Sequence, residues 1–139
     1  MNKYLIGSIL GTTLTVFGTT SLANNYDRDA LTVDRVVDQN IEFNFPNDNN
    51  IYPEVSDFKI LNYVVMSNEY GERQVTVTLE NSSSGNRIFV SDQIMALFAN
   101  GKRVSPFEEK ISFKGGETQT ITLNFRNSKY PILRVYTRN

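Results

Sequence analysis

Short runs in which apolar and polar residues alternate, each closed by turn residues, constrain the fold of this chain more than any other feature. The clearest runs span residues 74–80 and 120–125, where every second side chain is apolar. An alternation of period two places the apolar side chains on one face of a β-strand. No long segment after residue 23 has the period of a helix. The pattern therefore predicts an all-β protein.

Weaker runs of the same kind predict further strands at residues 32–37, 41–45, 58–66, 88–90, 111–113 and 132–138. Residues 91–99 fit helix and strand spacing equally well, and Asn100-Gly101 fits either a helix end or a type I′ hairpin turn. Because Val104 resumes the apolar pattern, we favour the hairpin. About seven or eight short strands predict an antiparallel β-sandwich, with a barrel as the alternative. The expected core comprises Val75, Val77, Leu79, Leu97, Ile121, Leu123, Phe125, Leu133 and Val135.

The first 23 residues have the layout of a secretory signal peptide. Lys3 is the only charge before Asp27, and the apolar run that follows is diluted by Thr and Gly. Ser21 and Ala23 supply the small residues that precede a cleavage site. An uncleaved membrane anchor is the alternative, but no basic cluster follows the run. We therefore expect cleavage after Ala23, which leaves residues 24–139 as a single domain without a membrane span.

Composition excludes several classes of chemistry. The chain has no cysteine and no histidine, so a Ser-His-Asp triad, a cysteine nucleophile and a zinc, copper or haem site are all unavailable. Its net charge of −1 predicts no wrapping of nucleic acid and no strong attachment to anionic lipid. We expect no enzyme activity, no cofactor and no metal. An exported protein without cysteine fits a bacterial periplasm or exterior better than a eukaryotic one.

Three segments resemble the immunoglobulin-like domains of exported bacterial proteins. QVTVTLEN (residues 74–81) resembles their strand B, LFANGKRVSP (97–106) their C-to-C′ hairpin, and ISFKGGETQTITLNF (111–125) their D-to-E segment. The likeness spans residues 74–138 and extends to one domain of the periplasmic fimbrial chaperones. It implies an immunoglobulin-like sandwich. The chaperones have two domains, and their pilus-anchoring Arg and Lys pair has no counterpart here, so the resemblance implies little about function.

The final strand offers the most coherent candidate surface. Arg134, Tyr136 and Arg138 share one face by the two-residue period, and Arg126 and Tyr130 flank the preceding turn. Cations beside phenol rings can bind a protein partner or an anionic polymer through charge-assisted hydrogen bonds and cation–π contacts. Basic residues on a terminal strand also prevent edge-to-edge aggregation, which is the alternative interpretation. The second candidate contact region is the loop formed by Asn100, Gly101, Lys102 and Arg103.

Two polar motifs are weaker candidates. An acidic group near the expected mature N-terminus lacks the glycine-containing spacing of a calcium loop, so we interpret it as solvated. Asn81-Ser82-Ser83 is a glycosylation sequon, which has meaning only in a eukaryotic secretory route. The acidic group comprises Asp27, Asp29, Asp34 and Asp38.

These observations predict a secreted or periplasmic, non-catalytic binding or adaptor module. It would engage a protein partner in the cell envelope or outside the cell through its exposed strands and loops. One alternative is a subunit or accessory factor of a surface assembly, such as a fimbria, a secretion system or a matrix. Another is a small inhibitor that fills an enzyme cleft with the loop at residues 100–103 or 81–87.

Overall fold

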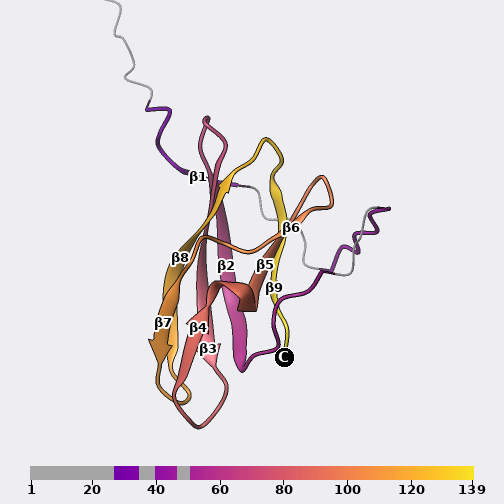
Figure 1. Cartoon of the computed structure of the whole chain (residues 1–139). Coiled ribbons are helices and arrows are strands. Elements are labelled where there is room, and N and C mark those ends of the chain that lie inside the picture. Colours follow the sequence, from indigo (N-terminus) through magenta and orange to yellow (C-terminus); the bar gives the residue numbers. More distant parts are fainter. Residues whose placement is uncertain (1–26, 35–39, 47–50) are drawn as a thin grey trace, which may run out of the picture.

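The computed structural model describes residues 27–34, 40–46 and 51–139, and it confirms an all-β protein (Figure 1). One 3-10 turn, η1 (Ser91–Gln93), occurs in this part of the chain, and no helix there is long and apolar enough to cross a bilayer. The expected leader, Val36-Val37 and Asp38 lie outside the described residues. The strands are β1 (Thr32–Val33), β2 (Phe58–Ser67), β3 (Glu72–Asn81), β4 (Arg87–Val90), β5 (Ile94–Phe98), β6 (Arg103–Val104), β7 (Lys110–Phe113), β8 (Thr118–Asn127) and β9 (Ile132–Thr137).

The strands form three sheets in which every ladder is antiparallel. The largest has the order β1-β2-β3-β8, and the smaller two have the orders β4-β7 and β6-β5-β9. An isolated parallel bridge between Val55 and Arg138 joins the segment before β2 to the end of β9. The antiparallel architecture predicted from the alternating runs is therefore confirmed.

Side chains from all three sheets share one hydrophobic core. The ring of Phe58 on β2 meets the ring of Phe89 on β4 edge-on at 5.4 Å between centroids, and that of Phe113 on β7 at 5.0 Å. Edge-to-face pairs of this kind add about 0.5–1.5 kcal/mol to the burial of the rings. Seven of the nine expected core residues are buried, namely Val75, Val77, Leu79, Leu97, Leu123, Phe125 and Val135.

The other two expected core residues differ, and a β-bulge explains one of them. Ile121 is half-buried but packs against the core. Leu133 is only half-buried, and Ile132 is buried in its place. Leu97 pairs with Arg134 and Phe98 with Ile132, so Leu133 is an extra residue in β9. An extra residue shifts the alternation by one position, which is why the strict two-residue period was wrong there.

The predicted strand at residues 41–45 is also wrong. These residues have no regular secondary structure, although the rings of Phe43 and Phe45 stack at 6.2 Å. The alternating pattern of Ile41, Phe43 and Phe45 is real, but none of these residues pairs with a strand of a described sheet. Alternation predicts a half-buried surface, and it forms a strand only where an edge is available to pair with.

The hairpin between β5 and β6 is confirmed, but its turn is not type I′. Gly101 alone in the turn has a positive φ, +81°, and its N–H donates to the carbonyl of Phe98 at 2.9 Å. A type I′ turn would also require a positive φ at Asn100. The loop is instead a type I turn followed by a left-handed glycine, which closes slightly longer hairpins.

Candidate functional site

The predicted site residues separate into two groups. Four of them lie on or beside the β6-β5-β9 sheet, and the three arginines among these four contact the N-terminal segment of the chain; we call the four residues the arginine face. The others gather at the end of the molecule where the β5–β6 hairpin and the β8–β9 loop lie, the upper end in Figure 1. The arginine face comprises Arg103, Arg134, Tyr136 and Arg138, and the second group comprises Asn100, Gly101, Lys102, Arg126 and Tyr130.

Cations and rings alternate along the arginine face. The guanidinium of Arg103 lies 5.4 Å from the ring centre of Tyr52 and 5.9 Å from that of Tyr136. The guanidinium of Arg138 lies 5.8 Å from the same Tyr52 ring. Each contact of this type contributes about 0.5–1 kcal/mol at an exposed site.

The arginine face holds a segment of the same chain. Arg103 donates from Nη1 to the carbonyl of Ile51 at 3.1 Å, and Arg134 donates to the carbonyl of Ile41. The N–H of Ser56 donates to the carbonyl of Arg138 at 2.9 Å. These bonds hold residues 41–46 and 51–56 against the sheet. The grouping of cations was predictable from the period of β9, but the long-range contacts with this segment had no signal in the sequence.

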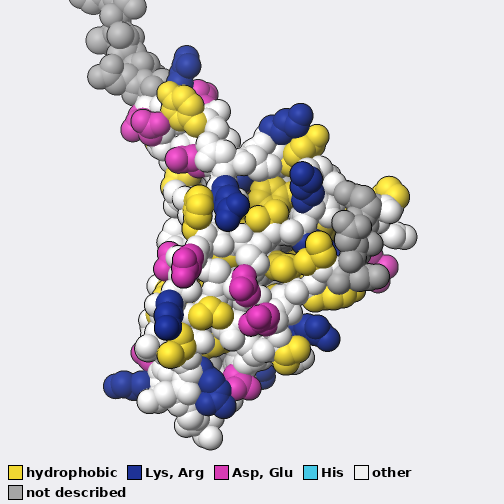
Figure 2. Space-filling view, in the orientation of Figure 1, with side chains coloured by type: hydrophobic (Ala, Val, Ile, Leu, Met, Phe, Trp, Pro, Cys, Tyr) yellow, Lys and Arg dark blue, Asp and Glu magenta, His cyan; other side chains and the backbone are white. Residues whose placement is uncertain are grey.

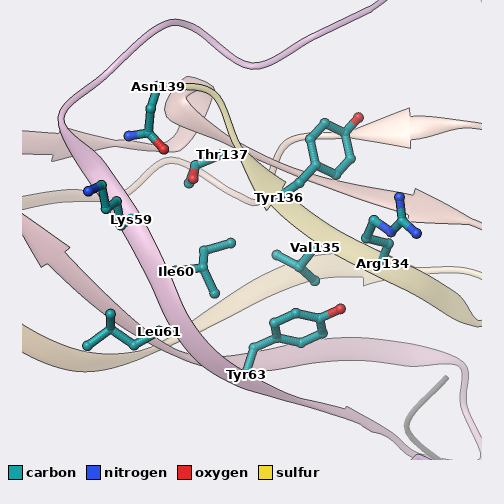
Figure 3. A pocket seen from close by; sticks show the side chains of 9 residues that line it. All are labelled: Lys59, Ile60, Leu61, Tyr63, Arg134, Val135, Tyr136, Thr137 and Asn139. Atoms are coloured by element: carbon teal, nitrogen blue, oxygen red, sulfur yellow. The ribbon is translucent and has the colours of Figure 1, made fainter. Parts of the chain in front are cut away.

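An open hollow of about 450 Å³ lies beside this face, between β2 and β9. Figure 3 shows Ile60 and Tyr63 on β2 directed toward Val135 on β9, across the seam where the two sheets meet. Lys59 and Arg134 are the charged residues that line it. The hollow is therefore a gap between two sheet edges rather than a deep cleft.

The second group surrounds a separate hollow of about 380 Å³, which we call the basic hollow. Buried Phe98 and Phe125, with half-buried Val104, supply its apolar lining. Figure 2 shows Lys and Arg side chains beside hydrophobic surface at this end, with acidic side chains toward the upper left, and basic and acidic side chains intermixed over the lower half. The polar lining residues are Asn100, Lys102, Arg126, Asn127, Ser128, Lys129 and Tyr130.

Backbone hydrogen bonds set the position of the two loops. The N–H of Ala99 donates to the carbonyl of Pro131 at 3.0 Å, which ties the β5–β6 hairpin to the β8–β9 loop. The N–H of Ser128 donates to the carbonyl of Gly71 at 2.8 Å, and Nε of Arg73 donates to the carbonyl of Ser128 at 3.0 Å. The hollow thus lies between loops that are fixed to each other and to the β2–β3 turn.

Arg126 occupies an unusual backbone conformation at the rim. Its φ is +69°, the one positive value at a residue other than glycine in the described chain. Gln74 pairs with Asn124 and Glu72 with Asn127, so β8 carries an extra residue at this point. The N–H of Arg126 donates to Oδ1 of Asn124 at 2.7 Å, and its guanidinium lies 4.8 Å from the ring centre of Phe107. A bulge that redirects a side chain is typical of functional sites.

The charged residues that line the basic hollow are all positive. Lys102, Arg126 and Lys129 line it, and no carboxylate does. In the part of the chain that the structure describes, the ion pairs do not involve these cations. Glu69 lines a neighbouring hollow with Lys129 but pairs with Arg28 at 3.5 Å. The arrangement suits an anionic group above an apolar surface.

Comparison of the chain with models of known families, with curated proteins and with solved structures found no match. The case for a function therefore depends on the geometry of this chain.

The weaker polar candidates have local roles. Asp34 accepts a hydrogen bond from the hydroxyl of Ser67 at 2.5 Å and lies 3.7 Å from Arg73. Oδ1 of Asp27 accepts from the N–H of Asp29 at 3.0 Å. Among the described residues, no group of three or more acidic side chains could hold a metal ion. Asn81, the first residue of the sequon, is fully buried and its Nδ2 is hydrogen-bonded inside the chain, so the fold leaves no room for a glycan there.

Proposed function

We propose that this chain is an exported, non-catalytic binding module with an immunoglobulin-like β-sandwich fold, and that its basic hollow binds an acidic segment of a protein partner. One observation carries the proposal: Lys102, Arg126 and Lys129 line a hollow that also has an apolar part and that no carboxylate lines. The layout of residues 1–23 supports export to the periplasm or the cell exterior. The all-β architecture supports the immunoglobulin-like fold.

The chemistry of the hollow favours a protein segment over an anionic polymer. A carboxylate at the rim would gain charge-assisted hydrogen bonds worth about 1.5–3 kcal/mol each. Half-buried Val104 and the exposed ring of Tyr130 add a place for one hydrophobic side chain, beside Phe98 and Phe125, which are already buried. A polysaccharide would use the cations but leave Val104 and Tyr130 uncovered. A segment that alternates acidic and apolar residues uses both.

The size of the site supports the same class of partner. The hollow is open and holds about 380 Å³, near the lower limit of pockets that enclose a small molecule. The ring of Phe107 is half exposed beneath Arg126, and the ring of Tyr130 lies 5.3 Å from Nζ of Lys129. Aromatic and Arg side chains together are enriched where proteins bind one another.

A peptide titration followed by NMR tests this function. The probe is a nine-residue peptide that alternates Glu and Leu, and its matched control replaces every Glu with Gln. We expect the Glu peptide to shift the amide signals of residues 98–102 and 126–130, with at least about tenfold higher affinity than the Gln peptide. Equal affinities, or shifts confined to the arginine face, would contradict the proposal.

Charge variants localise the effect. Replacing Lys102, Arg126 and Lys129 together with Gln should abolish binding of the Glu peptide. Lys114→Gln is the matched control, since Lys114 is an exposed cation at the opposite end of the sheets. A photo-crosslinker in place of Tyr130, used in intact cells, should then capture a partner whose captured segment is acidic. Capture of a segment without carboxylates would count against the assignment.

A further inference from the structure

β8 is an edge strand whose outer side is open. The order β1-β2-β3-β8 places it at one margin of the large sheet. The N–H of Asn81 donates to the carbonyl of Glu117 at 2.9 Å, which sets the phase of the ladder with β3. In an antiparallel ladder, alternate residues bond inward and outward. The backbone groups of Thr118, Thr120 and Thr122 therefore point away from β3.

A second hydrogen bond confirms this phase. The carbonyl of Asn124, two residues beyond Thr122, accepts from the N–H of Phe107 at 2.8 Å on the outer side. Within the part of the chain that the structure describes, no ladder covers the outer side of β8, and the side chain of Gln119 donates to the carbonyl of Ser112 on β7 at 2.9 Å. Three successive pairs of outward N–H and C=O groups thus remain available along the strand.

Nothing on this stretch blocks pairing. Edge strands are usually protected by charged side chains, proline or a bulge. Residues 118–123, TQTITL, contain no charge and no proline, and the bulge comes only at Arg126. The margin at β9 differs, because Arg134 and Arg138 lie there and Ser56 bonds to its end. An unprotected edge of this length is a template for another strand.

We propose that β8 pairs antiparallel with β8 of a second copy of this chain, with the two-fold axis at Thr120. The segment is self-complementary about that residue: Thr118 would lie opposite Thr122 of the second copy, and Gln119 opposite Ile121. No like charges meet across the axis, and a two-fold axis uses the same surface on both copies.

The existing sheet gives a precedent for the new pairs. On its exposed face the hydroxyls of Thr76 and Thr122, and those of Thr78 and Thr120, lie 2.9 Å apart across β3 and β8. Threonine pairs across the new seam would extend these rows.

This inference is independent of the proposed function, because the residues that would pair, 118–122, do not line the basic hollow. A chain that joins through β8 would leave the hollow free on both copies. The pair would therefore present two binding sites, which raises apparent affinity for a partner with two acidic segments.

Single cysteines test the register directly, because the full chain contains none. Paired antiparallel residues have Cα atoms about 4.5–5.5 Å apart, within the range that a disulfide accepts. Thr120→Cys should therefore form a covalent dimer under mild oxidation. Thr118→Cys should not, since the two cysteines would be about 14 Å apart along the strand. Equal crosslinking of both variants, or crosslinking of neither, would overturn the proposed register.

A matched lysine pair tests the association without a crosslink. Thr122→Lys and Thr76→Lys both remove the same threonine hydrogen bond, but only Thr122→Lys places a charge on the open edge. By sedimentation velocity, we expect the native chain and Thr76→Lys to form dimers in a concentration-dependent way, and Thr122→Lys to lower the dimer fraction at least about tenfold. A monomeric native chain at about 0.5 mM, or a Thr122→Lys variant that dimerises like Thr76→Lys, would refute it.

Discussion

The two ends of the molecule are built from similar polar loops but satisfy their polar groups differently. At the lower end in Figure 1, the β3–β4 and β7–β8 connections meet around buried Asn81. Its Nδ2 donates to the carbonyls of Gly85 and Lys114, each at 2.8 Å. Its Oδ1 accepts from the N–H of Ser83 at 3.1 Å and from the Ser83 hydroxyl at 2.8 Å. Every hydrogen-bonding position of this amide is used inside the chain.

At the end with the basic hollow, the cations that line the hollow are not paired with carboxylates of the described residues. The backbone of this end is fixed by hydrogen bonds, but the charges of Lys102, Arg126 and Lys129 have no carboxylate partner among the described residues. Arg126 also holds a backbone conformation that costs an L-residue about 1–2 kcal/mol. One end uses its polar groups for stability, and the other leaves its charges available. That difference points to the basic hollow as the functional end.

The largest effect should follow from Asn81→Ala. Removing the amide takes the acceptor from the N–H of Ser83, takes one of two donors from each of the carbonyls of Gly85 and Lys114, and opens a small cavity. A buried group without its partner costs about 1–3 kcal/mol, so we expect a loss of about 3 kcal/mol in the free energy of unfolding. Urea denaturation measures it. Ser82→Ala, at an exposed neighbour, is the control and should change stability by less than about 1 kcal/mol. Binding of the Glu peptide by folded Asn81→Ala should be unchanged.

Charge reversal at the basic hollow should weaken peptide binding and leave stability largely unchanged. Arg126→Glu places a carboxylate at the rim of the basic hollow, where it repels the acidic peptide and neutralises Lys102 or Lys129. We expect about 10- to 100-fold weaker binding, since hydrogen bonds between charged groups contribute about 1.5–3 kcal/mol. Isothermal titration calorimetry provides the affinity. Lys114→Glu, in the β7–β8 connection near Asn81, is the matched charge reversal. If it weakened peptide binding by a similar factor, only the net charge of the protein would matter.

The sequence predicted what depends on local pattern and missed what depends on long-range contacts. Alternation located β2, β3, β7 and β8, because each strand has one buried face. It placed Leu133 in the core because a bulge leaves no mark in a two-residue period. The cations of both sites were identifiable as residue types. The sequence did not show which cations contact the chain itself and which line an open hollow. Arg103 and Arg138 lie at the ring of Tyr52, and Arg126 lies at the ring of Phe107, and both rings are distant in sequence from most of these cations.

Two substitutions at Arg126 distinguish the effect of its strained backbone from the effect of its charge. Arg126→Ala and Arg126→Gly both remove the guanidinium, but only Gly adopts a positive φ without steric cost. We expect Arg126→Gly to be about 1 kcal/mol more stable than Arg126→Ala, measured by urea denaturation. Both variants should lose affinity for the Glu peptide equally. A Gly variant that binds like the native chain would assign the role of this position to its backbone.

The smallest expected effect is that of salt, and it distinguishes the two ends without a mutation. Raising NaCl from about 0.02 M to about 0.2 M shortens the screening length from roughly 20 Å to about 7 Å. Affinity for the Glu peptide should fall about threefold, because the rim cations are exposed and weakly screened at low salt. The free energy of unfolding should change by less than about 0.5 kcal/mol, since the bonds of Asn81 join neutral groups. Affinity that is insensitive to salt would mean that the apolar lining, rather than the cations, dominates recognition.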